Sequence, residues 1–215
     1  MKSLIMICAM LVLFVGCSES PSMGYQIGSV GPAGGLIFYD DEADGIDDIP
    51  GYRYLEAAPE DYTNGATTGF MFGFYKDPNS DEPIAVTGTE TALGTGAQNT
   101  TALVQTMGTQ AYPSATWDPV SVTGDPSPTY AAKLCDDYAL NGFNDWFLPS
   151  LDELELMYEE LYLDGVGDFN AGSNYWSSSE VNRETVYIQH FAENPQSTQA
   201  SKGSITVRMR PVRMF

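Results

Sequence analysis

The sequence contains few of the residues on which most enzyme chemistry depends. It has three cysteines and one histidine. Cys8 and Cys17 lie near the N-terminus, so Cys135 is the lone cysteine of a folded domain and no internal disulfide is expected. Cys135 lies on the apolar face of a predicted helix. His190 falls in the middle of the predicted strand VYIQHF, without a nucleophile elbow nearby. The sequence therefore argues against an enzyme.

Basic residues are also scarce. Nine Lys and Arg stand against 29 Asp and Glu, which gives a formal charge of −20 at pH 7. Phosphate binding depends on clustered basic side chains, and a domain this acidic repels polyanions at long range. This balance excludes nucleic acid as a partner and weighs against sulfated glycosaminoglycans. Basic proteins, neutral glycans and divalent cations are compatible with it.

Long apolar runs are missing after the N-terminus. Lys2 precedes an apolar run over residues 4–15, which Gly16 and Cys17 follow. This pattern predicts a bacterial lipoprotein signal peptide over residues 1–16, cleaved before a lipidated Cys17, although Phe14 stands where leucine is common. An ordinary secretory signal or an uncleaved anchor is the alternative.

The remaining chain has the length of one domain. We expect a lipidated tether over residues 17–24 and a single domain over residues 25–215. The lipid would attach the protein to a membrane of the bacterial cell envelope, at the outer membrane or the cell surface. No second apolar stretch approaches the length of a membrane span.

Three segments of the second half carry clear structural signals: FNDWFLPSLDELELMY (143–158), YWSSSE (175–180) and ITVRMRPVRMF (205–215). Ser150 and Glu153 form a capping box, which predicts a helix over residues 151–163. We expect strands over 175–180, 185–192 and 204–210, arranged as a small antiparallel sheet, with polar turns at 181–184 and 193–202.

The first half is less regular. Residues 36–39 and 52–55 predict a hairpin around an acidic turn, and residues 62–93 predict long ordered loops. A first helix is expected to start near Asn99 and to bury Leu103 and Met107. A second helix is expected over residues 129–140.

Further motifs lie in the first half: VGPAGGLIFYD (30–40), YRYLEAAPED (52–61) and LGTGAQNT (93–100). Together with the three later segments, and in the same order, they resemble the Lcl C-terminal domain family, also called domain of unknown function 1566. The resemblance covers most of the chain after the tether. It implies a compact α+β domain of C-type-lectin-like fold, with small antiparallel sheets, two to three helices, long ordered loops and end strands that pair with each other. It also implies a role in ligand binding on bacterial surface proteins.

Polar side chains on the late loops and strands form the predicted ligand surface. Some members of related folds display variable residues there, and the resemblance transfers that role to these positions; a plain solvated loop is the alternative. The expected contact residues are Asn182, Arg183, Tyr187, Gln189, Asn194, Gln196 and Gln199.

An acidic turn offers a candidate calcium site. Asp40, Glu42, Asp44 and Asp48 occupy positions one, three, five and nine of a calcium loop, with Gly45 at six. The closing glutamate is missing, because the twelfth residue is a glycine. The alternative is a solvated turn. The usual calcium-dependent lectin motifs are absent from the sequence, while sugar recognition through loop aromatics and amides remains open.

Two rarer residue types have competing interpretations. Arg208, Arg210 and Arg213 could form an anion site, but their place in the family-like ending favours pairing with nearby acids. Trp146 and Trp176 lie within family-like motifs and are expected in the core.

The function predicted from these observations is a lipid-anchored surface or envelope module that binds a protein or glycan ligand and supports adhesion without catalysis. Two alternatives remain. One is an envelope-structural lipoprotein without an external ligand. The other is an uncharacterised enzyme of the formylglycine-generating-enzyme-like fold, whose known members work through paired cysteines, whereas Cys135 has no partner.

Overall fold

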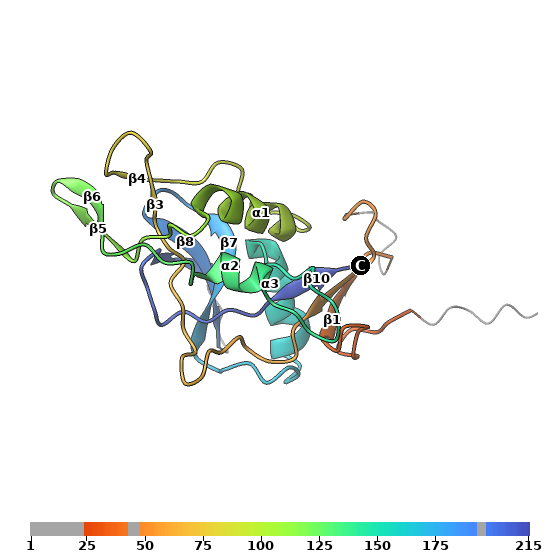
Figure 1. Cartoon of the computed structure of the whole chain (residues 1–215). Coiled ribbons are helices and arrows are strands. Elements are labelled where there is room, and N and C mark those ends of the chain that lie inside the picture. Colours follow the sequence, from red (N-terminus) through yellow and green to blue (C-terminus); the bar gives the residue numbers. More distant parts are fainter. Residues whose placement is uncertain (1–23, 43–47, 193–196) are drawn as a thin grey trace, which may run out of the picture.

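The computed structural model describes residues 24–42, 48–192 and 197–215 (Figure 1). Within these residues the protein is a mixed α/β domain with small antiparallel sheets and three α-helices. The predictions for Cys17, Asp44, Asn194 and Gln196 lie outside the described residues.

The first sheet joins the two ends of the domain. It has the strand order β1 (Leu36–Asp40), β2 (Tyr54–Ala57) and β10 (Val212–Met214), and both pairings are antiparallel. The predicted hairpin is confirmed as β1 and β2. The last strand adds to this hairpin beside β2, so the closing strand of the chain pairs with the second strand and not with the first.

Glycines in the VGPAGG segment permit a close approach to β2. A Cβ at Gly31 would overlap the Glu56 carboxylate, and a Cβ at Gly35 would overlap the backbone carbonyl oxygen of Ala57. Glycine therefore lets this segment lie directly against the central strand of the sheet.

The second sheet contains β7 (Ser173–Glu180), β8 (Thr185–Phe191) and β9 (Ser197–Ser201), all antiparallel. Residues 175–180 and 185–192 were predicted as strands, and both predictions are confirmed. The third strand is β9, inside the segment 193–202 that the sequence predicts as a turn.

Residues 204–210 do not form the predicted strand. This segment makes an isolated parallel bridge between Tyr175 and Arg208. The Trp176 N–H donates to the Arg208 carbonyl at 2.9 Å, and the Arg208 N–H donates to the Asn174 carbonyl at 2.9 Å. Val207 and Met209 are both buried, which explains the strand-like alternation in the sequence. The backbone nevertheless forms no continuous ladder of hydrogen bonds here.

The helices lie close to their predicted positions. They are α1 (Gly96–Met107), α2 (Ala131–Asp136) and α3 (Leu151–Met157), and α3 continues as a π-helical turn, η1 (Tyr158–Tyr162). Leu103 and Met107 of α1 are buried, as expected, although the helix starts three residues before Asn99. Helix α2 is shorter than predicted at both ends.

The capping box of α3 is confirmed. The Glu153 N–H donates to Ser150 Oγ at 3.3 Å, and the Ser150 N–H donates to Glu153 Oε2 at 2.8 Å. Glu153 Oε1 also accepts from the Gly96 N–H at the start of α1, at 3.2 Å. One buried carboxylate therefore joins the N-termini of two helices.

The second sheet has a hydrophobic cluster on each face. Trp176 and Ile188 pack with residues of α1 and α2. Tyr175 and Phe191, whose side chains point to the opposite face, pack with α3 and the first sheet. Trp146 belongs to a third, smaller cluster, so Trp146 and Trp176 are core residues as predicted.

Basic side chains near the C-terminus are paired with acids. Arg210 Nη2 lies 2.7 Å from Asp61 Oδ1, and Arg213 Nη1 lies 2.9 Å from Glu56 Oε1. Arg208 Nη1 also reaches Asp61, at 3.3 Å. The three arginines therefore hold the end of the chain, as the structural interpretation of their motif predicts.

Candidate functional site

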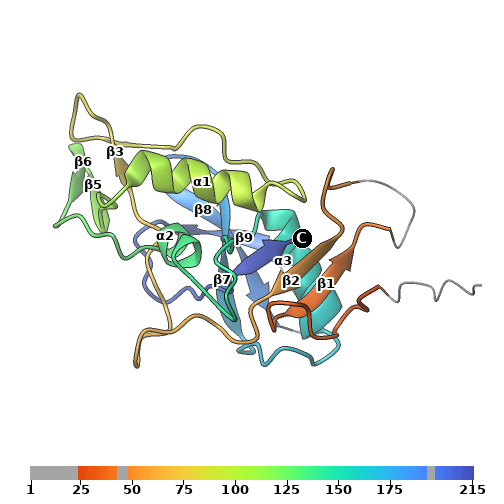
Figure 2. The same cartoon turned by 45° about the vertical axis from the view of Figure 1, so that its right-hand side comes forward.

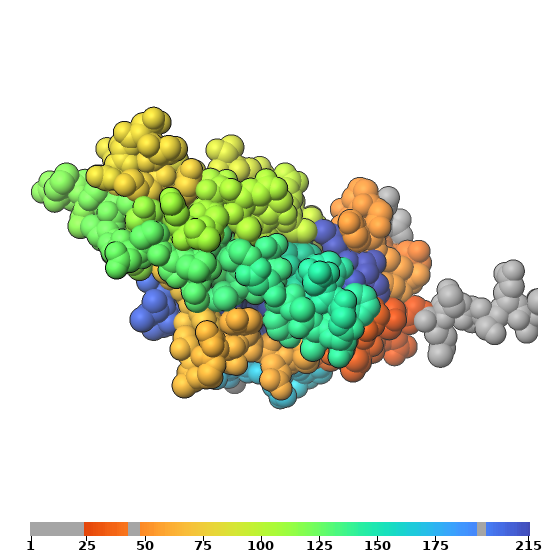
Figure 3. Space-filling model, in the orientation of Figure 1, coloured from red at the N-terminus to blue at the C-terminus, as the bar shows by residue number. Residues whose placement is uncertain are grey.

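Loops of the first half and turns of the second half meet at one end of the domain, which we call the distal end. It consists of the hairpin β3–β4 (Tyr75–Lys76 and Pro83–Ile84), the hairpin β5–β6 (Ser114–Trp117 and Val120–Thr123), and the turns at residues 181–184 and 201–205. The described chain begins at the opposite end (Figures 1 and 2). Figure 3 shows both hairpins projecting from the body of the domain.

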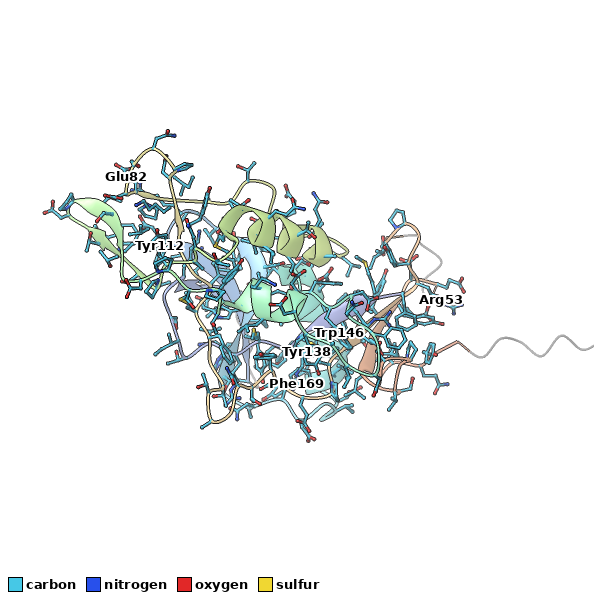
Figure 4. All side chains as sticks on the ribbon, in the orientation of Figure 1. Arg53, Glu82, Tyr112, Tyr138, Trp146 and Phe169 are labelled. Carbon is cyan, nitrogen blue, oxygen red and sulfur yellow. The ribbon has the colours of Figure 1, made fainter. Side chains whose placement is uncertain are left out.

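Specific contacts hold the distal end together. Phe74 and Tyr112 exchange backbone hydrogen bonds of 2.9 Å at the base of the two hairpins. The Val122 N–H donates to the Asp81 carbonyl at 2.6 Å. Arg183, in the turn between β7 and β8, lies 3.6 Å from Glu82. In Figure 4 Glu82 and Tyr112 lie at this end, and Arg53 lies at the other.

Two of the predicted contact residues lie in the turn at 181–184. Asn182 is exposed, but its Oδ1 accepts from the backbone N–H groups of Glu184 and Thr185 at 2.7 and 3.0 Å. It therefore also shapes the turn. Arg183 is partly exposed, and its guanidinium lies between Glu82 and Glu184.

Two more predicted contact residues lie on neighbouring strands. Tyr187 of β8 is directly opposite Gln199 of β9, so their side chains share one face of the sheet. Gln199 is exposed and Tyr187 is partly buried. Gln199 Oε1 accepts from the Thr185 hydroxyl at 3.2 Å.

Gln189 does not belong to a ligand surface, which corrects the sequence-based prediction. The residue is only 2% exposed. It lies opposite Tyr175 and two residues before Phe191, so it shares the face that packs into the core. Its Oε1 has no hydrogen-bond partner among the described residues.

The described part of the acidic turn is engaged by protein side chains. Arg53 Nε lies 2.9 Å from Asp40, and Arg53 Nη1 lies 2.7 Å from Glu42. The hydrogen bond from Arg53 holds the pKa of Asp40 below its usual value. Asp48 accepts from the Tyr39 hydroxyl at 3.2 Å. Among the described residues, no group of three or more acidic, histidine or cysteine side chains is arranged to hold a metal ion.

A groove at the distal end was not anticipated from the sequence. It runs between β5 and the turn after β9, and we call it the Trp117 groove. Its lining residues are Phe74, Pro113, Ser114, Ala115, Trp117, Ser201, Gly203 and Ser204.

Close backbone contact forms one wall of this groove. A Cβ at Gly203 would overlap the carbonyl oxygen of Pro113, so glycine is needed where the turn meets the hairpin. Trp117 is 46% exposed, and its ring meets Phe74 in a T-shaped contact with 6.2 Å between centroids. An adjoining hollow shares Pro113 and includes Ile205, which is 71% exposed.

Neither hollow is lined by a charged residue. This is unusual in a chain with 29 acidic side chains. The sequence could have indicated Trp117 through its place in a Ser- and Pro-containing loop outside the predicted elements. Composition could not indicate that Trp117 is exposed while Trp146 and Trp176 are buried.

The two residues considered for catalysis lie away from this groove. Cys135 is fully buried beside Met209, and burial raises the pKa of its thiol. His190 Nδ1 lies 3.0 Å from Asn174 Oδ1. Both positions agree with packing or structural roles for these side chains.

Comparison with known proteins finds no matching family model and no matching curated protein. Among solved structures, the chain is similar to a fimbrial protein from Bacteroides ovatus ATCC 8483, with a TM-score of 0.49 and 15% sequence identity. The alignment covers 84% of this chain and 44% of that protein, so this chain spans less than half of the fimbrial protein. Within the described residues, no helix has the length and apolar character needed to cross a membrane.

Proposed function

We propose that the protein is a non-catalytic ligand-binding or adhesion module, anchored by lipid to the bacterial cell envelope and presenting its distal end to a ligand. The observation that carries this proposal is the position of the uncharged groove and its surrounding turns. They lie at the end of the domain opposite the point where the described chain begins. A lipid on Cys17 would hold the other end near the membrane.

The fold proposal is a C-type-lectin-like domain of the Lcl C-terminal type. Three features support it: the closing strand in the first sheet, the long ordered loops between β2 and α2, and the arginine pairs that hold the final segment. Domains of this kind place recognition on loops supported by a rigid sheet.

Binding of the full-length protein, purified in detergent, to arrays of glycans and host-matrix proteins tests the proposal. The arrays are probed with calcium and with a chelator, because the acidic turn remains a candidate calcium site. We expect a saturable hit that is lost when Trp117, Arg183 and Tyr187 are all replaced by alanine. The matched control replaces Tyr52, which is exposed and distant from the distal end, by alanine.

The two possible failures have different meanings. If folded protein binds nothing on either array, the proposal is wrong and the envelope-structural alternative is favoured. If binding is saturable but survives the triple substitution, the ligand surface lies elsewhere on the domain.

A further inference from the structure

We infer that the Trp117 groove binds a neutral oligosaccharide without calcium. This inference rests on the proposed binding function and assigns its ligand class. It follows from three properties of the groove: an exposed tryptophan ring, a lining of hydroxyl groups and a lack of charge.

The first property is the exposed aromatic surface. Trp117 is 46% exposed at the end of β5, whereas Trp146 and Trp176 are 2% and 0% exposed. The indole packs against the buried ring of Phe74 in a T-shaped contact. One face of a pyranose ring presents mainly C–H groups, and an ordered aromatic ring gives such a face an apolar contact at little entropic cost.

The second property is the hydroxyl lining. Ser114, Ser201 and Ser204 line the groove together with Trp117. The Ser114 hydroxyl lies 2.6 Å from that of Thr123, and the Ser204 hydroxyl lies 3.2 Å from that of Thr206. A hydroxyl group both donates and accepts hydrogen bonds, so it can match the alternating donors and acceptors of a sugar. The adjoining hollow adds further threonine and serine side chains.

The third property is the missing charge. The formal charge of the chain is −20, so its field repels sulfated or carboxylated glycans before contact. A cationic peptide would be attracted to the protein, but no carboxylate lines the groove to pair with it. A neutral, hydroxyl-rich ligand avoids both penalties.

The lining also implies that calcium takes no part in this binding. Calcium requires six to eight oxygen ligands and favours carboxylates, which the groove lacks. The described part of the acidic turn, Asp40 to Glu42, lies at the opposite end of the domain, beside Arg53.

The test uses the full-length protein in detergent and a panel of neutral gluco-, manno- and galacto-oligosaccharides, each paired with a sulfated counterpart. We expect binding of at least one neutral oligosaccharide, unchanged by chelator and stronger than that of its sulfated counterpart. Trp117→Ala should weaken this binding about tenfold, since loss of the ring removes most of the aromatic contribution. Trp117→Phe should retain more of the affinity, and Tyr52→Ala should retain all of it.

Tryptophan fluorescence gives a second readout that does not depend on immobilisation. Because Trp117 is the exposed tryptophan, acrylamide should quench mainly its emission, and a bound oligosaccharide should protect it. Preference for the sulfated forms, loss of binding with chelator, or unchanged affinity in Trp117→Ala would each overturn the inference. If the protein binds a host-matrix protein but no neutral oligosaccharide, this inference is wrong while the proposed function stands.

Discussion

Lys202 is a fully buried cation. Its Nζ lies 2.5 Å from Glu180 Oε1, and the two side chains are 0% and 3% exposed. The Val86 N–H donates to the other oxygen of Glu180 at 2.6 Å. Removing one partner of such a pair leaves an uncompensated buried charge.

We therefore predict that Lys202→Met lowers the free energy of unfolding by about 3–5 kcal/mol. Urea unfolding followed by circular dichroism measures this change. The double variant Lys202→Met with Glu180→Gln should recover part of the loss, because it removes the unpaired carboxylate. Equal stability of the single variant and the wild type would contradict the assignment of a buried ion pair.

Residue roles that depend on local sequence could be predicted, and those that depend on packing could not. The arginine pairs and the core positions of Trp146 and Trp176 followed from their motifs. Gln189 was misplaced because the family resemblance assigned display residues to the late strands, whereas the core beneath α3 extends to this position on β8. Trp117 was overlooked because composition does not distinguish an exposed tryptophan from a buried one, and its place in a loop was the only local signal.

At the scale of elements, the start of α3 has a built-in pH response. Burial raises the pKa of Glu153 to about 7, despite the backbone N–H groups of Ser150 and Gly96 that donate to its carboxylate. In the unfolded chain the pKa is about 4.3. Between these values the folded state holds a proton that the unfolded state has lost. The contribution of this group to stability is therefore fully present below about pH 4 and is lost as the pH rises through 7.

We predict that the wild type loses more unfolding free energy between pH 5 and pH 8 than Glu153→Gln does, by about 3 kcal/mol at most. Urea titrations of both proteins at the two pH values provide the comparison. The comparison uses the change in unfolding free energy from pH 5 to pH 8 within each protein. Any effect of the substitution that does not depend on pH cancels in that change. Parallel pH profiles would show that the Glu153 carboxyl titrates normally.

The elements themselves were predictable where the sequence is strongly patterned. The capping box located α3, and alternating side chains located β7 and β8. The strand β9 was missed because Ser-Thr-Gln-Ala-Ser has no apolar alternation and its pairing with β8 is decided by tertiary contacts. Apolar and polar side chains alternate over residues 204–210, but this segment pairs with β7 at a single bridge. The sequence pattern alone therefore predicted a strand that does not form.

At the scale of the whole molecule, the proposed orientation predicts which thiols can be labelled. Cys135 is buried, and Cys17 would carry lipid. An added cysteine at Asn79, exposed in the β3–β4 turn, should react with a membrane-impermeant maleimide on intact cells if the distal end faces outward. The wild type should remain unlabelled. Labelling of Asn79→Cys only after the outer envelope is breached would favour the envelope-structural alternative.

The arginine pairs join residues that are far apart in the sequence, and this separation has a consequence for biosynthesis. Arg213 is 157 residues from Glu56, and Arg210 is 152 residues from Ala58, whose carbonyl oxygen it binds. The first sheet also needs β10, which is synthesised long after β2. A chain emerging from the ribosome can therefore assemble parts of the core, but β2 lacks one of its two partner strands until β10 has emerged. If the protein is exported as proposed above, this late pairing would keep the polypeptide open enough to pass through a translocation channel in an extended form.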